Sequence, residues 1–174
     1  RQMEARLGEE PFRDGVREYL KRFAFGNASW SDLIAILAPR GTGDLEAWSR
    51  AWVDERGRPR VRTELACDSG RVGRLALHVS DPLDGRALWW PQDIEVALGY
   101  HDRIELLPVR LDGARTEVAA AGRPAPLFVL PNGGGIAYGE FRLDAASLAW
   151  LTEHLPEIPD TLTRGAAWVT LWDA

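Results

Sequence analysis

The sequence predicts an α+β protein in which a helical region is followed by an antiparallel β-sandwich and then by further helices. Two observations support this prediction. Apolar residues recur at helical spacing at both ends of the chain, and they alternate with polar residues through the middle. These changes of period divide the 174 residues into three predicted domains, 1–57, 58–143 and 144–174.

Residues 1–57 have the patterning of short amphipathic helices. Gly8 is typical of a helix C-terminus, and Pro11 is favoured in the first turn of the helix that follows. Ser29 with Asp32 resembles a capping box at the start of another helix, and Asp44 is expected to cap one more. The expected apolar face of the second helix is Phe12, Val16, Tyr19, Leu20 and Phe23, and the next buried stripe is Leu33, Ile34 and Leu37. The helix that Asp44 caps carries Leu45, Trp48, Trp52 and Val53.

Residues 58–143 contain about six short alternating stretches, which are typical of strands in a sandwich. His101-Asp102 is expected to form a tight hairpin turn. No helical crossover separates the strands, which argues against a parallel sheet. Cys67 falls on the apolar face of the first strand and is expected in the core. The side chains expected inside the two packed layers are Val61, Leu65, Leu77, Val79, Ile94, Val96 and Leu98.

From Asp144 the period is helical again, and a last helix is expected from Thr161 to Ala174. Its tryptophans Trp168 and Trp172 are four residues apart, as are Trp48 and Trp52. This spacing favours core positions for both pairs. We also expect the chain to cover Trp168, Leu171 and Trp172 only in part, and the same holds for Met3 and Leu7 in the opening helix.

Composition excludes several classes of protein. The apolar share of 45% and charged share of 27% are typical of a soluble globular protein. The net charge of −5 argues against nucleic-acid binding. No apolar run approaches the ~20 residues of a membrane span. The single cysteine excludes a disulfide framework, and we expect a cytoplasmic protein.

Motifs for common catalytic chemistry are absent from the sequence. The three histidines, His78, His101 and His154, lie far apart, so H-E-x-x-H does not occur. No serine sits in a nucleophile elbow, and no phosphate-binding loop is present. The glycines 133–135 are interpreted as a flexible connection between strands. We therefore predict no catalytic, cofactor-binding or metal-ligating residue in this chain.

Several motifs, in order, resemble the aminopeptidase N family of gluzincin metallopeptidases. The stretch Arg1–Gly8, then Pro11–Gly15 and Tyr19-Leu20, resembles a segment that follows the family's zinc site. Leu130–Gly133 with Gly139–Asp144 resembles the entry to its C-terminal helical domain, with Phe141 where the family often has tyrosine. Between them, the matching positions are Asn27-Ala28, Asp32-Leu33, Asp44-Leu45, Trp48, Trp52, Gly57 and Pro59.

The resemblance implies that residues 1–57 end a thermolysin-like catalytic domain, that 58–143 form a β-sandwich, and that 144–174 begin a helical domain. It implies a parent protein that removes N-terminal residues from peptides by means of a zinc-bound water, a glutamate base and a tyrosine. Those residues lie upstream in the family, so none is assigned here. The expected partners are the rest of the aminopeptidase and, through it, peptide substrates, without nucleic acid or membrane.

Two further expectations follow. Arg1 is not methionine and residues 1–7 have the pattern of a helix already under way, which predicts a piece of a longer protein that is catalytically inert alone. The alternative interpretation is a stand-alone β-sandwich binding module that uses Trp89 or Trp90 as an exposed anchor.

Overall fold

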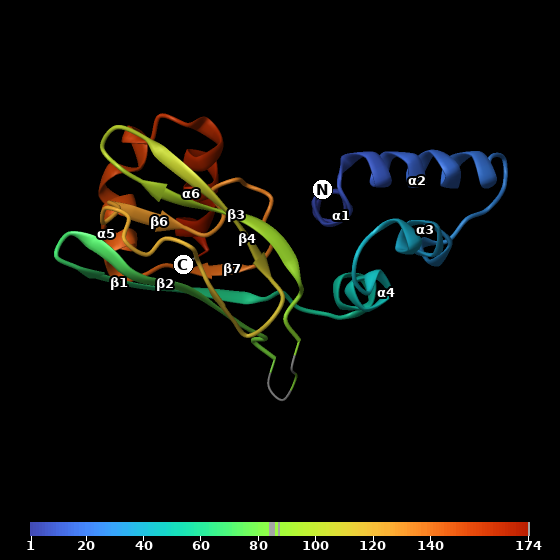
Figure 1. The fold of residues 1–174 in the computed structure, drawn as a ribbon, viewed down its shortest axis with the longest axis horizontal. Helices are drawn as coiled ribbons and strands as arrows, with labels where there is room; N and C mark the ends of the chain where they lie inside the picture. The colour runs from blue at the N-terminus through green and yellow to red at the C-terminus, as the bar shows by residue number, and fades with distance from the viewer. Residues whose placement is uncertain (84–85, 87, 174) are drawn as a thin grey trace. The chain divides into compact units, whose positions relative to one another are not determined.

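The computed structural model describes residues 1–83, 86 and 88–173, and its chain divides into two compact units, Arg1–Arg56 and Gly57–Ala174. Each unit is described by itself (Figure 1). No helix among the described residues is long and apolar enough to cross a bilayer.

The first unit is helical. Its helices are α1 (Gln2–Leu7), α2 (Glu9–Arg22), α3 (Trp30–Leu37) and α4 (Leu45–Ser49), with a 3-10 turn at Ala38–Arg40 and a π-helical stretch at Arg50–Asp54. Its buried cluster consists of Met3, Ile34, Leu37, Leu45 and Trp48.

Local capping chemistry fixes where these helices begin. The Ser29 side chain accepts from the Asp32 amide, and the Asp32 carboxylate accepts from the Ser29 amide at 2.9 Å, which completes the predicted capping box. Asp44 caps α4 by accepting from the Ala47 amide at 2.7 Å. Both predicted helix starts are therefore confirmed.

Two expectations for the first unit are wrong. Met3 is buried and Leu7 packs against the same cluster, because α3 and α4 already supply the neighbour that α1 needs. Leu20 is 63% exposed, since Gly15 is the only fully buried residue of α2 and brings the helix close to Leu37. The rest of the expected α2 face is half-buried.

The second unit contains two sheets. The first sheet has the order β5-β2-β1-β7 and the second has the order β4-β3-β6. All strand pairs are antiparallel except β1 with β7, which is parallel. The strands are β1 (Arg60–Asp68), β2 (Arg71–Ser80), β3 (Gln92–Gly99), β4 (Ile104–Leu111), β5 (Arg115–Glu117), β6 (Phe128–Leu130) and β7 (Glu140–Arg142).

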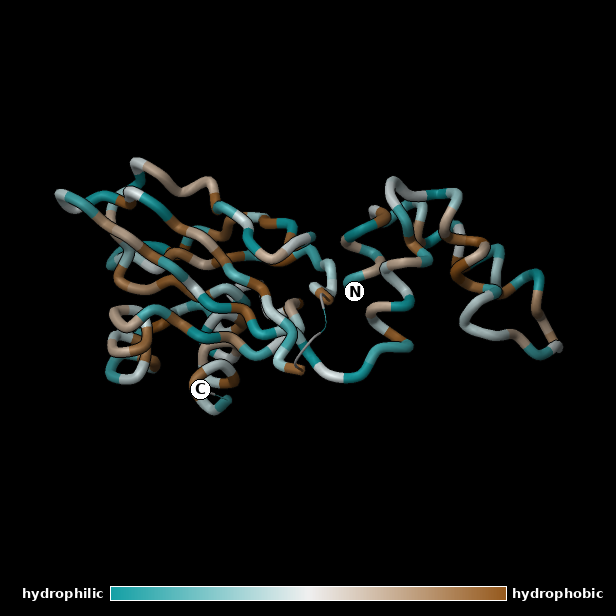
Figure 2. The backbone as a smooth tube through the Cα atoms, turned by 90° about the horizontal axis from the view of Figure 1, so that it is seen from below, coloured by the Kyte–Doolittle hydropathy of each residue, from teal (hydrophilic) through white to brown (hydrophobic). Residues whose placement is uncertain are grey.

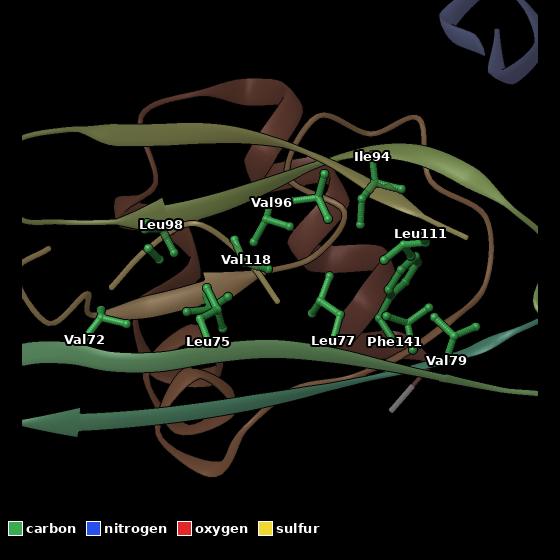
Figure 3. Packing of buried hydrophobic residues seen from close by; sticks show 14 residues of the cluster. Val72, Leu75, Leu77, Val79, Ile94, Val96, Leu98, Leu111, Val118 and Phe141 are labelled. Carbon is green, nitrogen blue, oxygen red and sulfur yellow. The ribbon is translucent and has the colours of Figure 1, made fainter. Parts of the chain in front are cut away.

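The two sheets share one apolar core. Figure 3 shows Leu75 and Leu77 of β2 pointing toward Val96 and Leu98 of β3 across the space between the sheets. Colouring by hydropathy shows the alternation of polar and apolar residues along these strands (Figure 2). Ile94 and Val96 are buried while Glu95 is half-buried, so the predicted register of β3 is confirmed.

The prediction for β1 is correct at its start and wrong at its end. Val61 is fully buried, whereas Leu65 is half-buried and Cys67 is exposed. Cys67 is directly opposite the buried Val72 and so still lies on the core side of the strand, but residues 66–68 are all exposed because this end of β1, next to the hairpin turn, extends past the packed core.

Two helices, α5 (Ala145–His154) and α6 (Thr161–Trp172), pack on the outer face of the second sheet. Ala97, Phe128 and Leu130 contribute to this second core and alternate with residues that face the first core. Asp144 caps α5 and Asp160 caps α6. The last helix begins at Thr161 as predicted and ends at Trp172, and Ala174 lies outside the described residues.

Candidate functional site

The three histidines occupy separate environments. His78 lies 2.6 Å from a Glu64 carboxylate oxygen, His101 is exposed in the β3–β4 turn, and His154 stacks on Trp150 with ring centroids 5.0 Å apart. Across residues 1–83, 86 and 88–173, no group of three or more His, Cys, Asp or Glu side chains could hold a metal ion. The described residues therefore do not fit a zinc centre.

The candidate functional site is instead an apolar surface on α5 and α6, which we call the α5–α6 patch. It consists of Leu148, Leu162, Trp168, Val169 and Trp172. Trp168 is 60% exposed and Trp172 is 85% exposed, so the core positions favoured by their spacing are wrong, and the expectation that they are covered only in part is confirmed. Leu155, Leu171 and Thr152 line a groove between the two tryptophans and Leu148.

Helix α6 buries small residues and exposes most of its large apolar ones. Its buried residues are small: Thr163, Ala166, Ala167 and Thr170. Its large apolar side chains are exposed instead, except for Leu171, which is half-buried. A surface helix normally turns its large apolar residues toward the core and its polar residues outward. An apolar surface of this kind is typical of an interaction site.

Polar contacts fix α6 to the sheets and so position the patch. The Thr163 hydroxyl donates to the Gly133 carbonyl at 3.2 Å. At the other end, the Arg58 guanidinium forms an ion pair with Asp173 at 2.7 Å, and this hydrogen-bonded contact raises the pKa of Arg58. Arg58 precedes β1, so both ends of α6 are held on the sheet scaffold.

Two polar clusters near this surface were not predicted from the sequence. The buried Gln92 side chain donates to the Tyr138 carbonyl and accepts from the Tyr138 amide, both at 2.9 Å. Glu140, only 7% exposed, lies between the guanidinium groups of Arg60 and Arg142. The sequence signal for Gln92 is its place between Trp90 and Ile94, the apolar residues two positions before and after it. No comparable signal marks Glu140.

The tryptophans of the alternative interpretation do not form an exposed pair. Trp90 is 1% exposed and Trp89 is half-buried, so Trp90 is not an anchor for a ligand. In the first unit, Trp48 is buried and stacks on the half-buried Trp52 with ring centroids 5.6 Å apart. The prediction that spacing places this pair at the core is confirmed for Trp48.

Glu140→Gln is expected to lower the free energy of unfolding of the second unit by about 1–2 kcal/mol at neutral pH. Arg60, through two hydrogen bonds at 3.0 and 3.2 Å, and Arg142, through one at 2.6 Å, hold the pKa of the Glu140 carboxyl below its ordinary value. Because both arginines are about half exposed, water can solvate their guanidinium groups in the variant, and the loss of stability stays small.

A depressed pKa in the folded state stabilises the protein above the ordinary glutamate pKa of about 4.3, and the gain is lost as the pH falls through the folded value. Urea titrations at pH 7 and pH 3 should therefore show the gap between wild type and Glu140→Gln narrowing at low pH. Glu117→Gln, which removes a 55% exposed carboxylate, is the control and should change stability by less than about 0.5 kcal/mol. If the difference in unfolding free energy between wild type and Glu140→Gln did not change with pH, the stabilising role of the ionised Glu140 carboxylate would be contradicted.

Comparison with known proteins gives no matching family model. Among curated proteins, the chain is 34% identical over 186 residues to an Aminopeptidase N of Streptomyces lividans, covering 99% of the chain and 22% of that relative. It is 38% identical over 66 residues to a Leucyl aminopeptidase of Saccharolobus solfataricus, covering 38% of the chain and 8% of that relative. It is 31% identical over 83 residues to an Aminopeptidase N of Lactococcus lactis subsp. cremoris, covering 48% and 10%. The chain thus spans about a fifth of the Streptomyces relative.

Proposed function

We propose, from the premise that this chain is part of an aminopeptidase N-like protein, that it is a scaffold within a zinc-dependent enzyme that removes N-terminal residues from peptides. The similarity to Aminopeptidase N over 99% of the chain confirms the family resemblance drawn from the motifs. The activity, the zinc and the peptide substrates belong to the proposal for the whole protein.

The scaffold role places the α5–α6 patch against further helices of the same protein. In this proposal, residues 1–57 end a thermolysin-like catalytic domain, 58–143 form a β-sandwich and 144–174 begin the C-terminal helical domain held over the active site. The observation that carries it is the outward face of α6, where Trp168, Val169 and Trp172 are each at least 60% exposed. About four-fifths of the Streptomyces relative lies outside the matched segment, which supplies ample chain to cover this face.

The zinc of the proposed enzyme would be held by the rest of the protein. Among the described residues, His78 is engaged with Glu64 and His154 with Trp150, and they are not close to a third ligand. We therefore assign no step of the reaction to this chain. A cytoplasmic location is part of the same proposal, consistent with the one free cysteine.

The double substitution Trp168→Ser/Trp172→Ser tests the scaffold role. In the isolated 174-residue chain, the exposed tryptophans should drive self-association, and the double variant should remain monomeric in sedimentation velocity over a concentration series. In the full-length protein, the same change should lower stability by several kcal/mol, since truncating one buried tryptophan costs about 3–5 kcal/mol. The control is Leu106→Ser, which removes a 43% exposed side chain of β4.

Two results would contradict the proposal. One is a wild-type chain that is monomeric throughout, with both indoles protected from acrylamide quenching. The other is chelator-sensitive release of the amine from aminoacyl anilides by the 174-residue chain alone, because we expect that activity only from the full-length protein.

A further inference from the structure

The outer face of the first sheet carries a row of basic side chains, one from each of its four strands. Arg62 of β1 is directly opposite His78 of β2 and Arg142 of β7, and His78 is directly opposite Arg115 of β5. Directly opposite residues point to the same side of a sheet. We call these four residues the arginine row, and with strands spaced at about 4.8 Å it is roughly 14 Å long.

Three members of the row already have acidic partners. Arg115 contacts Glu117, His78 contacts Glu64 and Arg142 contacts Glu140, each at 2.6 Å. Arg62 is different. Within the part of the chain that the structure describes, its exposed guanidinium has no ion pair or hydrogen bond. The hydrogen bond with His78 lowers the pKa of Glu64, and the charge of Arg62 adds to this effect.

The balance of charge on this face is opposite to that of the chain. The face holds six arginines, three glutamates and one aspartate, a surplus of two positive charges, whereas the whole chain has a net charge of −5. The residues counted are Arg60, Arg62, Arg71, Arg74, Arg115, Arg142, Glu64, Glu117, Glu140 and Asp68.

The position of Arg62 is unfavourable for the sheet by itself. Like charges directly opposite each other destabilise a strand pair, and Arg62 is directly opposite Arg142. A bound anion would remove this repulsion. A guanidinium offers two parallel N–H donors that match the two oxygens of a carboxylate.

We infer that the arginine row is a binding surface for an acidic peptide segment, with the Arg62 guanidinium holding one of its carboxylates. A peptide fits better than a nucleic acid. The row is short and is flanked by Glu64, Glu117 and Glu140, which would repel a continuous phosphate backbone. Side-chain carboxylates, in contrast, are discrete and can contact the arginines between those glutamates.

This inference does not depend on the scaffold role. The α5–α6 patch belongs to helices that pack on the second sheet, whereas the arginine row lies on the outer face of the first sheet. The two surfaces can therefore be tested separately in one chain.

The test uses fluorescence anisotropy of a labelled hexaglutamate peptide titrated with the 174-residue chain at low and moderate salt. Arg62→Gln is expected to weaken binding about tenfold, the loss of a charged hydrogen-bond pair. The matched control is Arg110→Gln, which removes the same charge from β4 of the other sheet and should change binding less than about twofold.

Arg62→Glu tests whether a loss of peptide binding could be due to unfolding. It places a carboxylate opposite Arg142, so it should raise the urea midpoint of the second unit while abolishing peptide binding. The Trp168→Ser/Trp172→Ser chain should bind the peptide like wild type, whether or not the scaffold role is correct. Absence of binding, an equal loss in Arg62→Gln and Arg110→Gln, or tighter binding of a hexanucleotide than of the peptide would each overturn the inference.

Discussion

Trp90→Ala is expected to lower the free energy of unfolding of the second unit by about 3–5 kcal/mol. Trp90 is 1% exposed and is the largest fully buried side chain. The Arg86 guanidinium lies 5.7 Å from the ring centroid, and Gly57 lies beside the ring edge at the start of the unit. Removing the indole therefore loses buried apolar area and leaves a cavity, which urea titration followed by circular dichroism would detect.

The backbone at Trp90 makes the test more specific. Its φ of 44° is in the left-handed region, which is uncommon for a bulky residue and is maintained here by burial of the side chain. Trp90→Gly should therefore be less destabilising than Trp90→Ala, by about 1 kcal/mol. Trp172→Ala, at an 85% exposed position, is the control and should change stability of the isolated chain by less than about 0.5 kcal/mol. Equal losses at positions 90 and 172 would contradict the burial argument.

The elements that the sequence predicted well depend on local chemistry. Ser29, Asp44 and Asp144 begin helices because a side-chain oxygen next to a free backbone amide stabilises a helix start wherever the helix is packed. Ile94 and Val96 are inside because alternation fixes the two faces of a strand. The family resemblance could also be predicted from sequence, since each motif that carries it is a short continuous run of residues.

The wrong predictions concern which other element packs against the apolar face of a helix. Spacing favoured core positions for Trp168 and Trp172, but α6 packs through alanine and threonine and leaves their side exposed, as the separate expectation of incomplete cover had it. Met3 shows the opposite error. It was expected to be only partly covered, but α3 and α4 bury it within the first unit. Cys67 illustrates a third limit, because alternation gives the side of the strand on which a residue lies but not where along β1 the packed core ends.

The arginine row could not be located from sequence, and of the α5–α6 patch the sequence predicted only that Trp168, Leu171 and Trp172 would be partly uncovered. The arginine row requires β1 to lie between β2 and β7, and its pairing with β7 is parallel and joins residues about eighty positions apart. The sequence argued for antiparallel neighbours, so Arg62 and Arg142 had no reason to be placed together. The α5–α6 patch likewise depends on which face of α6 meets the sheet, and helical periodicity alone does not decide that.

Gly133→Ala is expected to destabilise the second unit by about 1–3 kcal/mol, which would correct the interpretation of residues 133–135 as a flexible connection. A Cβ at Gly133 would collide with the Cβ of Ala97 and lie 2.8 Å from its backbone nitrogen. Gly133 and Gly134 are buried, and the Gly134 amide donates to the Glu95 carbonyl at 3.3 Å. This turn therefore lies directly on β3, and only a missing side chain allows that approach.

Gly165→Ala provides the matched control because the same substitution should have the opposite sign there. Gly165 is exposed within α6, and a Cβ at this position would meet no atom within 4 Å. Replacing a glycine inside a helix by alanine stabilises it by about 0.5–1 kcal/mol. Urea midpoints of the two variants should therefore move in opposite directions from that of wild type. If Gly133→Ala were as well tolerated as Gly165→Ala, the close contact between this turn and β3 would be wrong, and the hydrogen bond from Thr163 to Gly133 could no longer be taken to hold α6 on the sheet.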